Sequence, residues 1–207
     1  AFIKFYNQEK EKRMIKGMFE QYVSPTIVNE LIKNPSKLNL GGEQQNLTVF
    51  FSDIRAFTTY SESRKPEEVV EILNEYLDAM TQCIFKWNGT VDKYVGDEIM
   101  AVWGAPIHQK DHAKLALRCS WDQLKILNKL KEKWKKEGKE PLDIGIGLNT
   151  GLMITGNIGS KMHKDYTVIG DAVNLAARLE AETRNYGTKK DLCYMIISDA
   201  TYQLVKD

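Results

Sequence analysis

Apolar residues recur at helical spacing in two long segments of the chain. After Pro66-Glu67-Glu68, a favourable helix start, they fall on one helical face at Val69, Leu73, Tyr76, Leu77, Met80 and Ile84. A second, longer helix is predicted from about residue 111 to residue 136. Helices with one apolar face bury that face against another layer of the fold.

Short apolar runs predict the strands of a sheet. Residues 47–51 form a β-rich run that ends at Ser52-Asp53, and strands at 90–95 and 99–103 are joined at Gly96-Asp97, a pair typical of tight hairpin turns. Further strands are predicted at 142–148, 153–158, 165–169 and 194–197, with a helix at 171–186. The order strand, helix, hairpin, helix, strand predicts an α+β fold, a ferredoxin-like βαββαβ sheet with its helices on one face.

The first 43 residues have a different pattern. Residues 1–22 carry one apolar stripe among many charges, typical of a helix that either docks on its own domain or pairs with a second copy. Ser24-Pro25 starts another helix that Pro35 stops, and Gly41-Gly42 indicates a linker. We expect signalling or linker helices over 1–43 and a second domain over 44–207. The chain starts without Met and stops within what reads as an unfinished helix, so we expect a fragment.

Composition narrows the class of protein. The 207 residues include 29 Lys and Arg against 28 Asp and Glu, a net charge of +1 that argues against a nucleic-acid polymer as partner. The lysine-rich residues 129–139 are interrupted by glutamates and indicate a solvated helix face. Widely spaced Cys83, Cys119 and Cys193 indicate neither disulfides nor a zinc site. No segment has the length and apolarity of a membrane span or the pattern of a signal peptide.

Two aspartates follow predicted strands and are candidates for a metal site. Asp53 follows the apolar run Val49-Phe50-Phe51, and Asp97 lies at the tip of the predicted hairpin. Neighbouring central strands would bring the two carboxylates together, and Mg²⁺ prefers a few carboxylates plus phosphate oxygens. The alternative is that each aspartate caps a turn, and spacing alone does not decide between the two.

Asn174 and Arg178 lie four residues apart and so on one face of the helix predicted at 171–186. Such a pair can bind charge that develops on a phosphate, but it can also be an ordinary surface pair with Arg178 bonded to Glu182. The glycines between residues 145 and 159 match no phosphate-binding fingerprint, and we interpret them as turns and close backbone packing.

Three segments resemble the catalytic domain of class III nucleotidyl cyclases, in the order in which that family carries them. They are FFSDIRAFT at 50–58, DKYVGDEIMAVWG at 92–104 and YTVIGDAVNLAAR at 166–178. The similarity extends over about residues 44 to 205, and FEQYVSP at 19–25 resembles the lead-in of bacterial members that follow a membrane or sensor domain. The resemblance implies a cyclase catalytic domain over 44–207 whose terminal strands are missing. The Lys or Arg by which the family contacts the terminal phosphates would be missing with them.

The resemblance implies a role for each candidate residue. Asp53 and Asp97, with the backbone carbonyl of Ile54, would bind two divalent ions, Mg²⁺ or Mn²⁺. Lys93 and Thr167 would read the purine base, in a combination that resembles the adenylyl rather than the guanylyl pattern. Asn174 would orient the ribose and Arg178 would stabilise the pentavalent phosphorus. Strand alternation alone also allows Lys93 to be an ion-pair partner of Asp97.

The expected activity is an adenylyl cyclase that converts ATP to 3′,5′-cyclic AMP and pyrophosphate in a homodimer with shared active sites. In the family, the metal residues of one protomer face the base-reading and transition-state residues of the other, so Asp53 and Arg178 of one site would come from different protomers. We expect a cytoplasmic domain, attached to the inner face of the membrane if a membrane segment precedes it. The alternatives are a guanylyl cyclase, a catalytically silent dimerisation module, and a polymerase palm, for which a basic groove is lacking.

Overall fold

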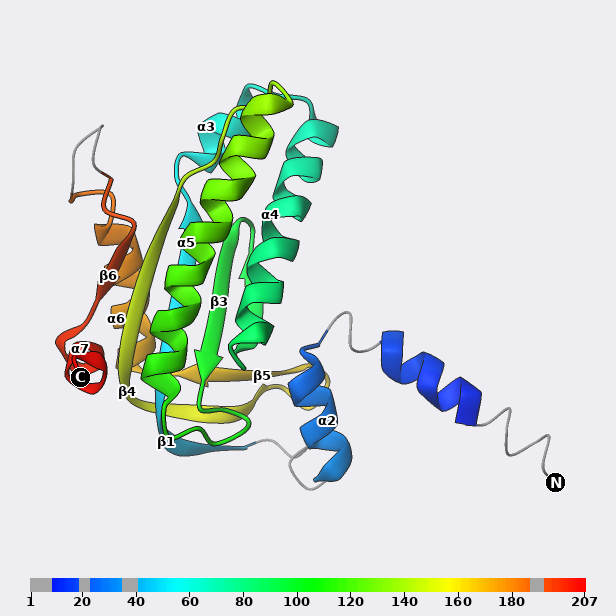
Figure 1. Cartoon of the computed structure of the whole chain (residues 1–207). Coiled ribbons are helices and arrows are strands. Elements are labelled where there is room, and N and C mark those ends of the chain that lie inside the picture. Colours follow the sequence, from blue (N-terminus) through cyan, green and yellow to red (C-terminus); the bar gives the residue numbers. More distant parts are fainter. Residues whose placement is uncertain (1–8, 19–22, 35–40, 187–191) are drawn as a thin grey trace.

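A computed structural model describes residues 9–18, 23–34, 41–186 and 192–207 (Figure 1). The helix predicted at 1–22 is present at 9–18, and its other residues lie outside the described residues. The remaining elements are α2 (Pro25–Lys33), β1 (Gly41–Ile54), α3 (Phe57–Glu62), α4 (Pro66–Lys86), β2 (Thr90–Val95), β3 (Glu98–Trp103), α5 (His112–Lys136), β4 (Ile144–Gly159), β5 (Lys164–Ile169), α6 (Asp171–Glu182), β6 (Met195–Ile197) and α7 (Asp199–Val205).

The sheet is antiparallel along the order β2-β3-β1-β4-β5, and β6 adds to β4 in parallel. Strand β1 is central: Phe50 is opposite Ala101 of β3 on one side and Leu148 of β4 on the other. The β2–β3 hairpin turns at Gly96, whose φ of 66° suits glycine. The predicted α+β fold is therefore confirmed.

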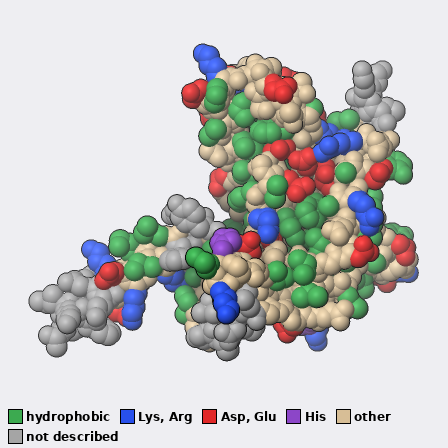
Figure 2. Space-filling view, turned by 180° about the vertical axis from the view of Figure 1, so that it is seen from behind, with side chains coloured by type: hydrophobic (Ala, Val, Ile, Leu, Met, Phe, Trp, Pro, Cys, Tyr) green, Lys and Arg blue, Asp and Glu red, His purple; other side chains and the backbone are tan. Residues whose placement is uncertain are grey.

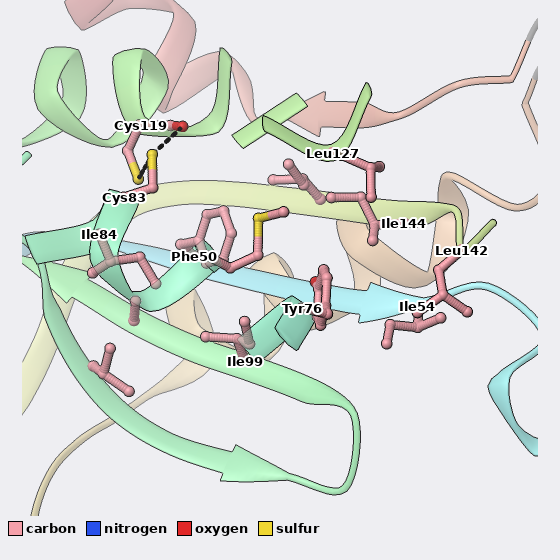
Figure 3. Close-up of a cluster of buried hydrophobic side chains, with 14 of the residues drawn as sticks. Phe50, Ile54, Tyr76, Cys83, Ile84, Ile99, Cys119, Leu127, Leu142 and Ile144 are labelled. Atoms are coloured by element: carbon pink, nitrogen blue, oxygen red, sulfur yellow. Dashed lines mark hydrogen bonds between the residues drawn. The ribbon is translucent and has the colours of Figure 1, made fainter. Parts of the chain in front are cut away.

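Helices α4 and α5 cover one face of the sheet (Figures 1 and 3). Both begin where the sequence predicts: Pro66 occupies the first turn of α4, followed by Glu67 and Glu68, and α5 follows Asp111. Their apolar faces meet alternate residues of β1 and β3 in one core cluster, which includes Phe50, Ile72, Tyr76, Met80, Ile84, Ile99, Trp103, Leu127 and Ile144.

Helix α6 covers the other face, whereas the predicted fold has all its helices on one face. The intervening strand residues Val49, Phe51 and Val102 form a second cluster there with Val173 and Ala176 of α6. The prediction of helices on one face therefore holds for α4 and α5 only. Central strands that are apolar on both faces have to be covered twice, which explains the difference.

Three other predictions at the level of elements are wrong. The strands predicted at 142–148 and 153–158 are one strand, β4, because β1 is long enough to pair with it from Gly41 opposite Asn157 to Ile54 opposite Ile144. Gly41 and Gly42 are the first residues of β1, so they do not form the predicted linker. Helix α6 ends at Glu182, before the predicted residue 186, and the C-terminal helix α7 ends at Val205.

Among the described residues, no helix combines the length and apolarity that crossing a membrane requires.

Candidate active site

Asp53 and Asp97 lie together at one end of the sheet. Asp53 is the penultimate residue of β1, and Asp97 lies in the β2–β3 turn on the neighbouring strand pair. The Ile54 backbone N–H donates a hydrogen bond of 3.2 Å to Asp97 Oδ2, which ties the turn to the end of β1. The sequence-predicted pair and the backbone of Ile54 are therefore brought into one cluster.

The two carboxylates interact strongly enough to change protonation. Burial, a hydrogen bond with Asp53 and the negative charge of Asp53 raise the pKa of Asp97 from 3.8 to about 7. Two carboxylates held this close repel each other when both are charged, and a cation between them removes that cost. The structure thus concentrates negative charge where the sequence predicted it.

Other charged residues surround this pair. Glu180 of α6 is almost fully buried, and its Oε1 has no hydrogen-bond partner among the residues that the structure describes. Burial, followed by the charge of Asp53, raises the pKa of Glu180 to about 7. Burial and Asp53 also raise the pKa of Glu98. Arg184 bonds the Asp53 carboxylate and lies 3.9 Å from Glu180 Oε2. Figure 2 shows acidic side chains gathered on one face of the molecule, beside basic side chains and an apolar area.

This cluster fits a hard divalent cation. Its oxygen ligands are carboxylates, which Mg²⁺ favours, and Mg²⁺ completes its shell with water and phosphate oxygens. Within the described ranges no group of three or more His, Cys, Asp or Glu side chains is arranged to hold a metal ion. Arg184 competes with such an ion for Asp53.

Lys93 and Thr167 form a second cluster, on β2 and β5. Thr167 Oγ1 donates a hydrogen bond of 2.7 Å to Asp92 Oδ2, and Lys93 Nζ lies 3.4 Å from Asp92 Oδ1. Lys93 Nζ also lies 3.9 Å from Asp165 on β5. The ion pairs of Lys93 are therefore with Asp92 and Asp165, and they explain its position without the pairing to Asp97 that strand alternation allowed.

Asn174 and Arg178 are exposed on one face of α6, as their spacing predicts. Arg178 Nη2 lies 3.8 Å from Asp171 Oδ1, and both side chains are mostly exposed. The surface pair of Arg178 is thus with Asp171 rather than the expected Glu182. Exposed ion pairs at this distance contribute little, so Arg178 can exchange Asp171 for a stronger anion at low cost.

Three residues of these clusters were missed as candidates from sequence: Asp92, Glu180 and Arg184. The signal for two of them was present, because Glu180 and Arg184 are four residues apart on what was predicted to be one helix. Asp92 is next to Lys93 in the sequence, but its role depends on its hydrogen bond with Thr167, which is distant in the sequence. Arg55 has a supporting role: its guanidinium donates to the Ile144 carbonyl at 3.0 Å and to the Thr183 carbonyl, which fixes the end of α6.

Comparisons with known proteins agree with this architecture. Residues 41–204 match the family model described as the adenylate and guanylate cyclase catalytic domain. The chain is 35% identical over 170 residues to Adenylate cyclase 1 of Rhizobium meliloti. This match covers 82% of this chain and 26% of that protein. The chain therefore belongs to the class III adenylyl and guanylyl cyclase catalytic domain family, and the resemblance seen in the sequence is confirmed.

Solved structures of both nucleotide classes are similar to this chain. The adenylyl cyclase CyaB from P. aeruginosa superposes with a TM-score of 0.74 at 39% identity, covering 81% of this chain and 84% of that one. The guanylyl cyclase Cya2 gives 0.73 at 38% identity, covering 81% and 82%. The fold likeness thus does not choose between ATP and GTP. The chain spans between a quarter and a third of the length of the curated relatives.

Proposed function

We propose that this chain is the catalytic domain of an adenylyl cyclase, which converts ATP to 3′,5′-cyclic AMP and pyrophosphate. The observation that carries the proposal is the Asp53–Asp97 pair at one end of the sheet, where burial, then a hydrogen bond with Asp53 and its charge, raise the pKa of Asp97 to about 7. Membership of the cyclase family supports a phosphorus–oxygen lyase reaction on a nucleoside triphosphate. In that reaction the ribose 3′-oxygen bonds to the α-phosphorus, the bond to pyrophosphate breaks, and the hydroxyl proton leaves.

Asp53, Asp97 and the backbone carbonyl of Ile54 would hold two divalent ions, Mg²⁺ or Mn²⁺. When bound, such ions supply positive charge that acidifies the 3′-hydroxyl and offsets the charge of the triphosphate. Asp97 has to be deprotonated to take part, and its pKa of about 7 makes that state available at neutral pH. Arg184 has to leave Asp53 for the carboxylate to turn to an ion.

Lys93 and Thr167 would recognise adenine. An ammonium group only donates hydrogen bonds, so Lys93 suits the unprotonated N1 of adenine and opposes the N1–H of guanine. The hydroxyl of Thr167 would accept from the 6-amino group. Both side chains lie on either side of Asp92, which supports their acting on one small group such as a base edge.

Asn174 and Arg178 would act on the ribose and on the reacting phosphate. Their exposed positions on one face of α6 leave both side chains available to a substrate. The guanidinium of Arg178 can donate hydrogen bonds to the oxygens of the α-phosphate, where negative charge develops as the new bond forms. Asn174 can hydrogen-bond a ribose oxygen and so align the 3′-hydroxyl for attack.

Two copies of the chain would make the complete site. In the family the aspartate pair of one protomer faces the base-reading residues of the other, and a two-fold dimer then has two equivalent sites. Exposed apolar residues near Lys93 and Thr167 support a second copy as the partner, because they would be covered by it: Tyr94, Val95, Leu152, Ile154 and Ile169. Specific activity that rises with protein concentration is the expected sign of such a dimer.

Product formation tests the proposal directly. We expect cyclic AMP from ATP, and much less cyclic GMP from GTP, with Mn²⁺ present and with no product from Asp53→Ala. A guanylyl cyclase would give the opposite nucleotide preference. A folded protein that makes neither product would favour the catalytically silent dimerisation module.

An exchange of the base-reading pair tests nucleotide recognition separately. Lys93→Glu with Thr167→Cys replaces the adenylyl pair with the guanylyl pattern, so preference should shift toward GTP. Unchanged ATP preference in this double variant would contradict the assignment of Lys93 and Thr167 to the base.

A further inference from the structure

Asp92 is a buried carboxylate that touches both base-reading side chains. Its side chain is 2% exposed, its Oδ2 accepts the hydrogen bond from Thr167 at 2.7 Å, and its Oδ1 lies 3.4 Å from Lys93 Nζ. That oxygen has no hydrogen-bond partner within the described residues. Burial raises the pKa of Asp92 above its ordinary value, and the contacts with Thr167, Lys93 and the backbone of Val168 offset part of that rise. The ammonium group beside Oδ1 favours the ionised carboxylate.

The contact joins two strands from opposite ends of the sheet order. Asp92 and Lys93 belong to β2, whereas Thr167 and Asp165 belong to β5. Figure 1 shows the end of β4 and strand β5 running across the direction of β3, which carries β5 back toward the β2 edge. The hydrogen bond between residues 92 and 167 therefore connects Asp92, a neighbour of Lys93 on β2, to the strand that carries Thr167.

A threonine hydroxyl has one hydrogen to donate and two lone pairs that accept. The hydrogen of Thr167 is directed to Asp92 Oδ2, because an ionised carboxylate can only accept. The hydroxyl can then offer a base nothing but lone pairs. Lone pairs attract the 6-amino group of adenine and repel the 6-oxo group of guanine.

We propose that Asp92 is a positioning residue that makes Thr167 an acceptor only, and in this way sets the preference for a 6-aminopurine over a 6-oxopurine triphosphate. The proposal rests on the proposed function, because it requires Thr167 and Lys93 to face the base. Asp92 fixes the direction of the Thr167 hydrogen bond. A threonine hydroxyl without such a partner could donate to the 6-oxo group of guanine or accept from the 6-amino group of adenine.

Asp92→Asn tests the direction of this hydrogen bond with little change of volume. The ammonium group of Lys93 would hold the amide oxygen on its own side, so the amide NH₂ would face Thr167. Thr167 would then accept from the amide, and its own hydrogen would turn toward the base. The ratio of kcat/KM for ATP to kcat/KM for GTP should fall by about tenfold or more. The reason is that Thr167 would donate to the base instead of accepting from it, which favours the 6-oxo group of guanine.

Two further variants separate this effect from structural damage. Asp165→Asn removes the other carboxylate beside Lys93 without touching Asp92, so the nucleotide ratio should stay within about twofold of the original. In a Thr167→Val background, Asp92→Asn should leave the ratio unchanged, because there is no hydroxyl to reorient. Melting temperatures of all variants report whether they are folded.

The outcomes distinguish the inference from the function on which it rests. If the unaltered protein makes cyclic AMP but Asp92→Asn lowers both activities equally, the role of Asp92 is wrong and the cyclase stands. If the unaltered protein makes no cyclic AMP, the proposed function itself fails.

A second measurement on the unaltered protein applies even if Asp92→Asn does not fold. Purine nucleoside triphosphates with hydrogen or a methoxy group at C6 both keep an unprotonated N1 for Lys93. An acceptor-only Thr167 should disfavour the methoxy oxygen, and an equal or higher kcat/KM for the methoxy compound would overturn the inference.

Discussion

Arg184 stands in the way of any cation that binds Asp53. Its guanidinium bonds that carboxylate and lies 3.9 Å from Glu180, so a metal ion has to displace it. Arg184→Gln should lower the Mn²⁺ concentration for half-maximal cyclase activity severalfold, measured at fixed ATP. Arg64→Gln is the control, because Arg64 pairs with Glu140 elsewhere on the surface. An unchanged or higher Mn²⁺ requirement for Arg184→Gln would mean that Arg184 does not compete with the metal.

Glu180 makes the stability of the metal-free protein depend on pH. Burial and Asp53 raise its pKa from 4.5 to about 7 in the folded chain, so between these values the folded state binds more protons than the unfolded state. The free energy of unfolding must then fall as pH rises from about 4.5 to 7. Asp97 contributes in the same direction.

Replacing Glu180 by Gln removes one titrating group without a large change of shape. The melting temperature of Glu180→Gln should decline less between pH 5 and pH 8 than that of the unaltered protein, both without metal. Part of the decline should remain because Asp97 still titrates. An equal decline in both proteins would show that the folded state does not raise the pKa of Glu180.

At the scale of single residues, the sequence predicts those that stand at the ends of local elements. Asp53 and Asp97 were found because one follows a strand and the other lies at a hairpin tip. Glu180 was not, because its burial depends on a distant strand: added Cβ atoms at Gly145 would lie 2.6 Å from Glu180 Oε1. A charge buried by long-range packing leaves no local signal.

At the scale of elements, Gly147 allows α6 to approach the sheet. A Cβ atom at Gly147 would lie 2.2 Å from the Ala176 carbonyl oxygen and 2.3 Å from the Glu180 backbone nitrogen. Close backbone packing is the predicted role of these glycines, although they lie within one strand rather than in turns. Helix α6, which carries Asn174 and Arg178, can lie this close to β4 because glycine has no side chain at the contact.

Gly147→Ala should therefore push α6 away from β4. Overpacking of this kind costs about 1–3 kcal/mol of stability, and we expect it to lower cyclase activity as well, because Asn174 and Arg178 move with the helix. Denaturant unfolding and the product assay check both effects. Gly17→Ala is the control, since a Cβ there meets nothing within 4 Å. A Gly147→Ala protein as stable as the original would contradict this packing.

The starts of the long helices were predicted closely and the long strands were not. Helix α4 begins at Pro66 and α5 begins at His112, next to the expected residue, because turn-by-turn apolar spacing and capping residues are local signals. Strand β4 was divided in two at Asn149-Thr150-Gly151, which has turn-like composition. Pairing with all of β1 keeps it extended, and such pairing is not written in the segment itself.

At the scale of the whole molecule, the contact between β2 and β5 is the feature least accessible from sequence. The sequence indicated Lys93 and Thr167 separately, through a family resemblance, but gave no reason for them to share Asp92. They share it because the sheet curves and brings β5 close to β2. Asp92 and Thr167, which are 75 residues apart along the chain, can then form a hydrogen bond. The order of strands alone would keep these residues apart.

The measurement that tests the central claim most directly mixes two inactive chains. Asp53→Ala lacks a metal ligand and Arg178→Ala lacks the phosphate donor, so each variant alone should make almost no cyclic AMP. If the sites are shared across a two-fold dimer, random mixing restores one intact site in half of the dimers, or about a quarter of the original specific activity. No recovery on mixing, with both chains folded and dimeric, would contradict an adenylyl cyclase whose sites are built from two copies.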